Sequence, residues 1–134
     1  MNLPIQGSCL CGGSRFELLS RPLFMSTCHC SRCRKVGGCT TVAVLAEHFR
    51  WVRGEELVER HRPEAPDHLV RAFCRRCGSY LGEPDLSAKG FPVAASALDD
   101  DPGVRQAFHE HVASKAPWYE ITDDLPRFAE HPPW

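Results

Sequence analysis

Short apolar runs, some alternating with polar residues and some continuous, divide the chain into segments of strand length. Between them lie 10 glycines and 11 prolines, which interrupt regular structure and favour turns. The stretch Arg62–Asp67, which contains two prolines, is predicted to be a surface loop. Strands are predicted at Arg15–Leu19, Met25–Cys30, Thr40–Leu45, Leu57–His61, Val70–Cys74, Pro92–Ala97 and His109–Ala113. The chain is therefore expected to be mainly β.

Helical signals are few and short. Ser31 can cap a helix that runs to Lys35, and the two glycines at Gly37 and Gly38 would end it. Weaker helical patterns cover Gly103–Phe108 and Asp123–Phe128. Short helices of this kind connect strands and do not form a layer of their own.

Length and composition are those of an ordinary globular domain. A chain of 134 residues fits one domain over residues 1–134. The composition, with 43% hydrophobic and 25% charged residues, excludes a disordered or coiled-coil chain. The formal net charge is −1, so the chain lacks the basic field of a nucleic-acid-binding protein. We therefore expect no nucleic-acid partner.

The chain also lacks the sequence signals of membrane insertion or secretion. Its first residues form neither the basic region nor the apolar region of a signal peptide. The longest mainly apolar run, Val42–Ala46, is too short to cross a bilayer. These features predict a cytoplasmic protein with no membrane partner.

Cysteine is the unusual component, with eight residues in the chain. They fall into a first pair, a central triplet, a last pair and a single residue: Cys9 and Cys11; Cys28, Cys30 and Cys33; Cys74 and Cys77; and Cys39. Cytosolic thiols stay reduced, so grouped cysteines there are metal ligands or reactive groups more often than disulfides. The grouping therefore predicts metal sites.

The two outer pairs can form one closed zinc site. Residues at i and i+2 of a strand share a face, so Cys9 and Cys11 can present two sulfurs together. Cys74 and Cys77 form a Cys-x-x-Cys turn, and Gly78 lets the backbone turn tightly beneath a metal. Four thiolates are typical of structural zinc. The alternative is two disulfides or free buried thiols.

The central triplet provides three further thiols. Three protein ligands with a fourth position open are typical of catalytic zinc, which predicts such a site at Cys28, Cys30 and Cys33. Cys39 follows a glycine pair that could turn the chain and close this site as a fourth ligand; otherwise it is a small buried hydrophobe. His29 lies between two ligands in an extended segment, so its side chain should point away from the metal.

Several further residues are candidates for a pocket. His109 and His111 occupy alternate positions of a predicted strand and could both face one side. Trp118 and Tyr119 could form a pocket wall, but core or surface packing is the favoured interpretation of both.

Four motifs occur in order over nearly the whole chain. They are Gly7-Ser8-Cys9-Leu10-Cys11-Gly12, Cys28-His29-Cys30-Ser31-Arg32-Cys33-Arg34-Lys35, Phe73-Cys74-Arg75-Arg76-Cys77-Gly78-Ser79, and Ser114-Lys115-Ala116-Pro117-Trp118 with Asp124-Leu125-Pro126. In these motifs the chain resembles the glutathione-dependent formaldehyde-activating enzymes (GFA) and their centromere-protein-V relatives.

The resemblance implies a zinc-stabilised, β-rich, tent-like fold in a single domain. It implies that Cys9, Cys11, Cys74 and Cys77 hold a structural zinc, and that Cys28, Cys30 and Cys33 hold a catalytic one. The family pattern has no ligand at the position of Cys39.

The resemblance also implies an activity, namely joining glutathione to formaldehyde in the manner of S-(hydroxymethyl)glutathione synthase, a carbon-sulfur lyase. Arg32, Arg34 and Lys35 could then pair with the glutathione carboxylates or form a solvated basic face. Two other classes remain open at this point. One is a non-catalytic zinc-binding interaction module, and the other is a thiol-based redox or metal-handling protein that uses Cys39.

Overall fold

A computed structural model describes residues 2–64 and 70–133, and short strands dominate it. The strands are β1 (Ile5–Ser8), β2 (Arg15–Leu18), β3 (Met25–Cys28), β4 (Thr40–Leu45), β5 (Phe49–Arg53), β6 (Val58–His61), β7 (Arg71–Cys74), β8 (Tyr80–Gly82), β9 (Gly90–Ala94) and β10 (Gln106–Glu110). Among the described residues the one α-helix is α1 (Ser31–Lys35), and single 3₁₀ turns lie at Ala46–His48, Glu55–Leu57, Ala95–Ala97 and Val112–Ser114. In the described chain, no helix has both the length and the apolar character needed to span a membrane.

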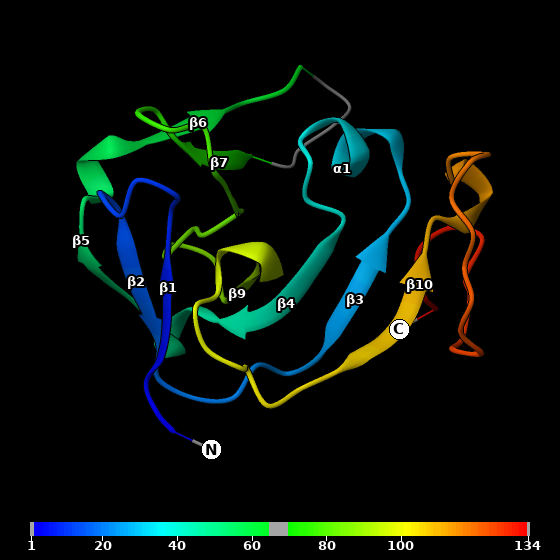
Figure 1. Cartoon of the computed structure of the whole chain (residues 1–134), viewed down its shortest axis with the longest axis horizontal. Coiled ribbons are helices and arrows are strands. Elements are labelled where there is room, and N and C mark those ends of the chain that lie inside the picture. Colours follow the sequence, from blue (N-terminus) through cyan, green and yellow to red (C-terminus); the bar gives the residue numbers. More distant parts are fainter. Residues whose placement is uncertain (1, 65–69, 134) are drawn as a thin grey trace.

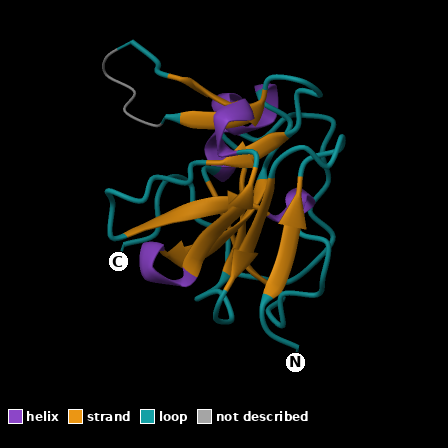
Figure 2. Ribbon diagram, turned by 90° about the vertical axis from the view of Figure 1, so that its left-hand side faces the viewer, coloured by secondary structure: helices purple, strands orange, loops and turns teal. Residues whose placement is uncertain are grey.

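The strands form two sheets, which Figure 1 shows curving around a common interior. The smaller sheet has the order β1-β2-β5, and the larger has the order β10-β3-β4-β9-β8-β7-β6. Neighbours are antiparallel except β3 and β10, which pair in parallel. Figure 2 shows the helical turns as short connections at strand ends. Strand β3 thus lies between β4 and β10, near one edge of the larger sheet.

Aromatic side chains fill the space between the two sheets. Phe16 of β2 stacks on Phe49 of β5 at a centroid distance of 5.1 Å, and Phe49 meets Phe91 of β9 edge to face at 5.3 Å. Val42 and Val93 are fully buried in the larger sheet. Burial of apolar area at about 25 cal/mol per Å² makes this cluster the main source of stability within the sheets.

The prediction of a mainly β fold is confirmed, and so is the short helix at Ser31–Lys35. The predicted strands are present with shifted ends. The segment Pro92–Ala97 leaves the sheet after Ala94 and continues as a 3₁₀ turn, while the predicted strand His109–Ala113 is the end of β10 followed by another such turn. The pattern missed β1, β5 and β8, which are short and lack clear alternation.

Two helical predictions are wrong. No residue of Gly103–Phe108 is helical, and from Gln106 onward the segment is strand β10, because parallel pairing with β3 satisfies its backbone. The segment Asp123–Phe128 is irregular and makes a single bridge between Arg127 and His109. The predicted loop Arg62–Asp67 lies partly outside the described residues.

Replacing Gly7 tests the packing between the sheets. A Cβ at Gly7 would lie 2.2 Å from Cζ of Phe16, the buried aromatic directly opposite it in the β1–β2 pair. We expect Gly7→Ala to lower the free energy of unfolding by about 1–3 kcal/mol, measured by urea titration, because a well-packed core has no room for the methyl group.

The control is the double variant Gly7→Ala/Phe16→Leu. Leucine removes the clashing ring atoms, so the two substitutions together should cost less than the sum of their separate costs. Strict additivity would show that the ring does not cause the loss.

Candidate functional site

Four sulfurs meet where the turn after β1 lies beside the turn after β7. Those of Cys9, Cys11, Cys74 and Cys77 all lie within 4.8 Å of one another. The Cys9 and Cys11 sulfurs are 3.5 Å apart, and the Cys11 and Cys74 sulfurs are 3.9 Å apart. Tetrahedral zinc with Zn–S bonds of about 2.3 Å needs sulfurs about 3.8 Å apart. The group therefore suits a tetrathiolate metal site, and none of its cysteines is in a disulfide.

Two similar turns hold these sulfurs in place. Gly12 and Gly78 have φ angles of 73° and 77°, a left-handed conformation that side chains disfavour, as the tight turn predicted at Gly78 requires. The backbone N–H of Ser14 donates to the Cys9 sulfur at 3.3 Å, and such a bond favours the thiolate. The backbone N–H of Leu10 donates to the Ser79 hydroxyl at 2.8 Å, so the two turns also contact each other directly.

The second sulfur group forms where β3 leads into α1. Cys28 ends the strand, Cys30 caps the helix, and Cys33 lies inside it, with all three sulfurs within 4.8 Å of one another. The Cys30 sulfur accepts a hydrogen bond from the Cys33 backbone N–H at 3.3 Å. A sulfur thus takes the part of the usual serine or aspartate cap. The end of the strand and the helix cap thus bring three thiols together within one short stretch of the chain.

Cys39 does not belong to this group. No described metal-ligating side chain joins the three sulfurs, and Cys39 lines a different cavity. Burial raises the pKa of its thiol, and the thiols of Cys33 and Cys30 raise it further. The structure therefore gives no support to a site closed by Cys39, and Cys39 lacks the low pKa expected of a redox thiol.

A cavity of about 270 Å³ opens beside the three thiols, and charged residues surround it. Arg71 is 5% exposed, donates to the Tyr80 hydroxyl at 3.0 Å and places its other terminal nitrogen 3.7 Å from the Cys33 sulfur. Hydrogen bonding from Cys28, with a further contribution from Arg71, lowers the pKa of Cys33 to about 5 despite its burial. Arg71 therefore places a positive charge beside the Cys33 sulfur. Sequence reasoning missed Arg71 because this residue lies 38 positions from Cys33.

The same cavity also carries acid and imidazole groups. Glu110, His111 and His131 line it, and burial raises the pKa of the Glu110 carboxyl. His111 lies just beyond β10 with a φ of 54°. The expectation that His109 and His111 share one face is therefore wrong, since the left-handed residue turns the chain out of the strand.

His29 points away from the thiols, as the alternation of an extended segment predicts. Its Nε2 lies 2.9 Å from Nδ1 of His109, and Nε2 of His109 lies 2.9 Å from a carboxylate oxygen of Asp123. Both imidazoles are 3% exposed. The carboxylate can only accept, so the His109 Nε2 carries a proton, and His29 in turn donates to the free Nδ1 of His109. A chain of hydrogen bonds through two buried imidazoles thus joins the C-terminal segment to the residue that follows strand β3.

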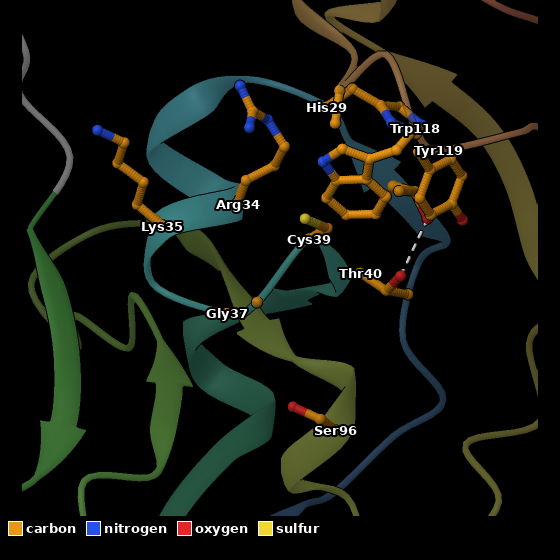
Figure 3. Close-up of a pocket in the computed structure, with 12 residues that line it drawn as sticks. His29, Arg34, Lys35, Gly37, Cys39, Thr40, Ser96, Trp118 and Tyr119 are labelled. Atoms are coloured by element: carbon orange, nitrogen blue, oxygen red, sulfur yellow. Dashed lines mark hydrogen bonds between the residues drawn. The ribbon is translucent and has the colours of Figure 1, made fainter.

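A second cavity, of about 520 Å³, lies on the His29 side of β3. Trp118 and Tyr119 from the C-terminal segment form one side of it, and Arg34 and Cys39 form another (Figure 3). The two aromatic side chains therefore do form a pocket wall. None of the three thiols lines this cavity.

The chain is similar to known proteins in sequence and in fold. The family model described as "Glutathione-dependent formaldehyde-activating enzyme" matches residues 4–114. A curated protein of Halomonas elongata, named "Putative glutathione-dependent formaldehyde-activating enzyme", is 32% identical over 127 residues, which cover 87% of this chain and 80% of the relative. A crystal structure of a Rhodobacter sphaeroides protein matches with a TM-score of 0.58 and 28% identity, covering 75% of this chain and 91% of the other.

Metal analysis can test the exclusion of Cys39. We expect Cys39→Ala to leave the metal content of the purified protein unchanged, because its sulfur lies outside both groups. The matched change Cys33→Ala should lower the metal content, since it removes one of the three grouped thiols. Elemental analysis by mass spectrometry provides the measurement, and an equal loss in both variants would contradict the geometry.

Nuclear magnetic resonance can test the histidine chain. Long-range proton–nitrogen spectra should show both His29 and His109 with the proton on Nε2. Asp123→Leu removes the acceptor and should allow His109 to populate the other tautomer, while Asp124→Leu, next to it, should not. A proton on Nδ1 of His109 in the unaltered protein would show that His109 donates to His29, which is the opposite of the expected hydrogen-bond direction.

Proposed function

The chain belongs to the glutathione-dependent formaldehyde-activating enzyme family, and on that premise we propose that it is a zinc-dependent enzyme of glutathione–aldehyde adducts. Its reaction joins glutathione to formaldehyde, or cleaves the adduct as a carbon-sulfur lyase. The observation that carries the proposal is the group of three thiols, with no fourth ligand among the described residues, at the edge of a cavity lined by charged side chains.

The donor sets fit zinc at both positions. In this proposal Cys9, Cys11, Cys74 and Cys77 hold a structural ion, and Cys28, Cys30 and Cys33 hold a catalytic one. A zinc ion with an open position supplies a Lewis acid, which deprotonates a coordinated thiol and polarises a carbonyl. The surrounding residues then have to bind, orient and exchange protons with the substrate.

Arg71 and Arg32 provide the positive charge of the cavity. Both can pair with a carboxylate of glutathione, and Arg71 is already fixed by its bond to Tyr80. Arg71 also stabilises thiolate at Cys33. These cations partly offset the negative charge that three thiolates and an anionic substrate bring into a small volume.

Glu110 is placed to exchange the proton of the reaction. The glutathione sulfur attacks the aldehyde carbon, a C–S bond forms, and the carbonyl π electron pair moves to oxygen. The thiol proton leaves to solvent, and the oxygen takes a proton from Glu110, whose raised pKa keeps a larger fraction protonated near neutral pH. Glu110 then regains a proton from solvent, so the addition has no net proton change. In the cleavage direction Glu110 takes the hydroxyl proton back.

The decisive experiment combines zinc stoichiometry with glutathione titration. The unaltered protein should contain two zinc ions and bind glutathione, and Cys28→Ser should contain one zinc ion and lose glutathione binding. Adduct formation with formaldehyde, followed by nuclear magnetic resonance, should be lost with it. Cys39→Ser, which changes a cysteine outside both groups, provides the matched control.

Other outcomes would decide against the proposal. Two zinc ions without affinity for glutathione would favour a non-catalytic zinc-binding module. A single zinc ion in the unaltered protein would leave the enzyme without a metal at its three thiols.

A further inference from the structure

We propose that the larger cavity, on the His29 side of β3, is a separate binding site for a small anion that carries a planar apolar group, such as an aromatic carboxylate. Its volume of about 520 Å³ is within the range of small-molecule sites and almost twice that of the thiol cavity, at about 270 Å³. This site goes beyond the proposed reaction, because no thiol of the metal groups lines it.

The wall of the cavity recognises a planar apolar group. Trp118 is 77% exposed, although a side chain as large and apolar as that of tryptophan is usually covered. Tyr119 beside it is 40% exposed. Their ring centroids are 6.2 Å apart, and the buried Ala116 extends the apolar surface. Aromatic side chains left open at a cavity mouth are typical of ligand sites, since a flat ligand covers them and displaces water.

The charges of the cavity select an anion. Arg34 and Lys35 line it, and no aspartate or glutamate is among the described residues that do so. The Nε atom of Arg34 is buried and has no hydrogen-bond partner among the described residues. A buried donor without a partner costs free energy. A small movement of the Arg34 side chain would let a ligand carboxylate supply the missing acceptor, and a carboxylate is the group that a guanidinium binds best.

The floor of the cavity is fixed before any ligand arrives. His29 lines it, and its ring is held through His109 by Asp123. The T-shaped contact between His29 and Tyr119, with centroids 5.2 Å apart, connects this floor to the aromatic wall. A rigid site loses little conformational entropy on binding, which favours affinity.

Glutathione fits this cavity poorly. It has no planar apolar group to cover Trp118, and its sulfur would lie across β3 from the three thiols. The structure therefore separates the two ligands, with the thiol substrate beside Cys28 and the aromatic anion beside His29.

Calorimetric titration of the zinc-loaded protein with naphthalene-2-carboxylate tests the proposal, with naphthalene-2-methanol as the neutral counterpart. We expect saturable 1:1 binding of the acid and about tenfold weaker binding of the alcohol. Trp118→Ala should lower the affinity for the acid about tenfold. The same variant should leave the free energy of unfolding and the zinc content unchanged, because the Trp118 side chain is exposed.

Arg34→Gln should abolish the preference for the acid over the alcohol. Arg21→Gln, an exposed arginine outside the cavity, is the matched control and should retain the preference. Equal binding of acid and alcohol by the unaltered protein, or no saturation up to about 1 mM of the acid, would overturn the site.

Two further measurements separate this site from the proposed reaction. Cys28→Ser, which alters the thiol group, should still bind the carboxylate with unchanged affinity, whether or not glutathione binds. Loss of carboxylate binding in Cys28→Ser, or competitive displacement of the carboxylate by glutathione, would place the ligand in the thiol site and overturn the proposal.

Discussion

The alternation of side chains along β3 and its extension to Cys30 is the constraint on which both cavities depend. The backbone N–H of Cys28 donates to the Cys39 carbonyl and that of His29 donates to the Glu110 carbonyl, both at 2.9 Å, so the chain stays extended between β4 and β10. Consecutive side chains must then point to opposite faces. The thiols of Cys28 and Cys30 share one cavity, while His29 belongs to the other.

The four-sulfur group imposes a second constraint, between parts of the chain that are distant in sequence. Cys11 and Cys74 are 63 positions apart, yet their sulfurs are 3.9 Å apart. Four thiolates repel one another unless a cation lies between them, so a metal ion held by this group would couple its binding to folding. The turn after β1 and the turn after β7 are thereby joined, which ties the smaller sheet to the far end of the larger one.

Sequence reasoning succeeded where the structure is local. Helix α1 depends on a cap, the residues after it and a glycine pair, all within one short stretch, although the cap is Cys30 and the prediction of Ser31 as the cap is wrong by one residue. The predicted strands follow their own apolar pattern. It failed at β10, where the residues Gln106 to Glu110 form a strand by pairing in parallel with β3, about 80 positions earlier. No local pattern reports a partner so distant, since parallel pairing requires a long crossover.

The sequence by itself determined which sulfurs lie together within each pair and within the triplet, because Cys-x-Cys and Cys-x-x-Cys spacing sets their direction within one strand or turn. The meeting of the two outer pairs was decided by the tertiary structure, since Cys11 and Cys74 are 63 positions apart. Only the tertiary structure decided which charged and aromatic groups surround them. It placed Arg71 beside Cys33, kept Cys39 out of the thiol group, and joined His29 through His109 to Asp123. The physical reason is that these contacts depend on strand order and on which face of a sheet each residue occupies, and strand order is settled by the packing of the whole core.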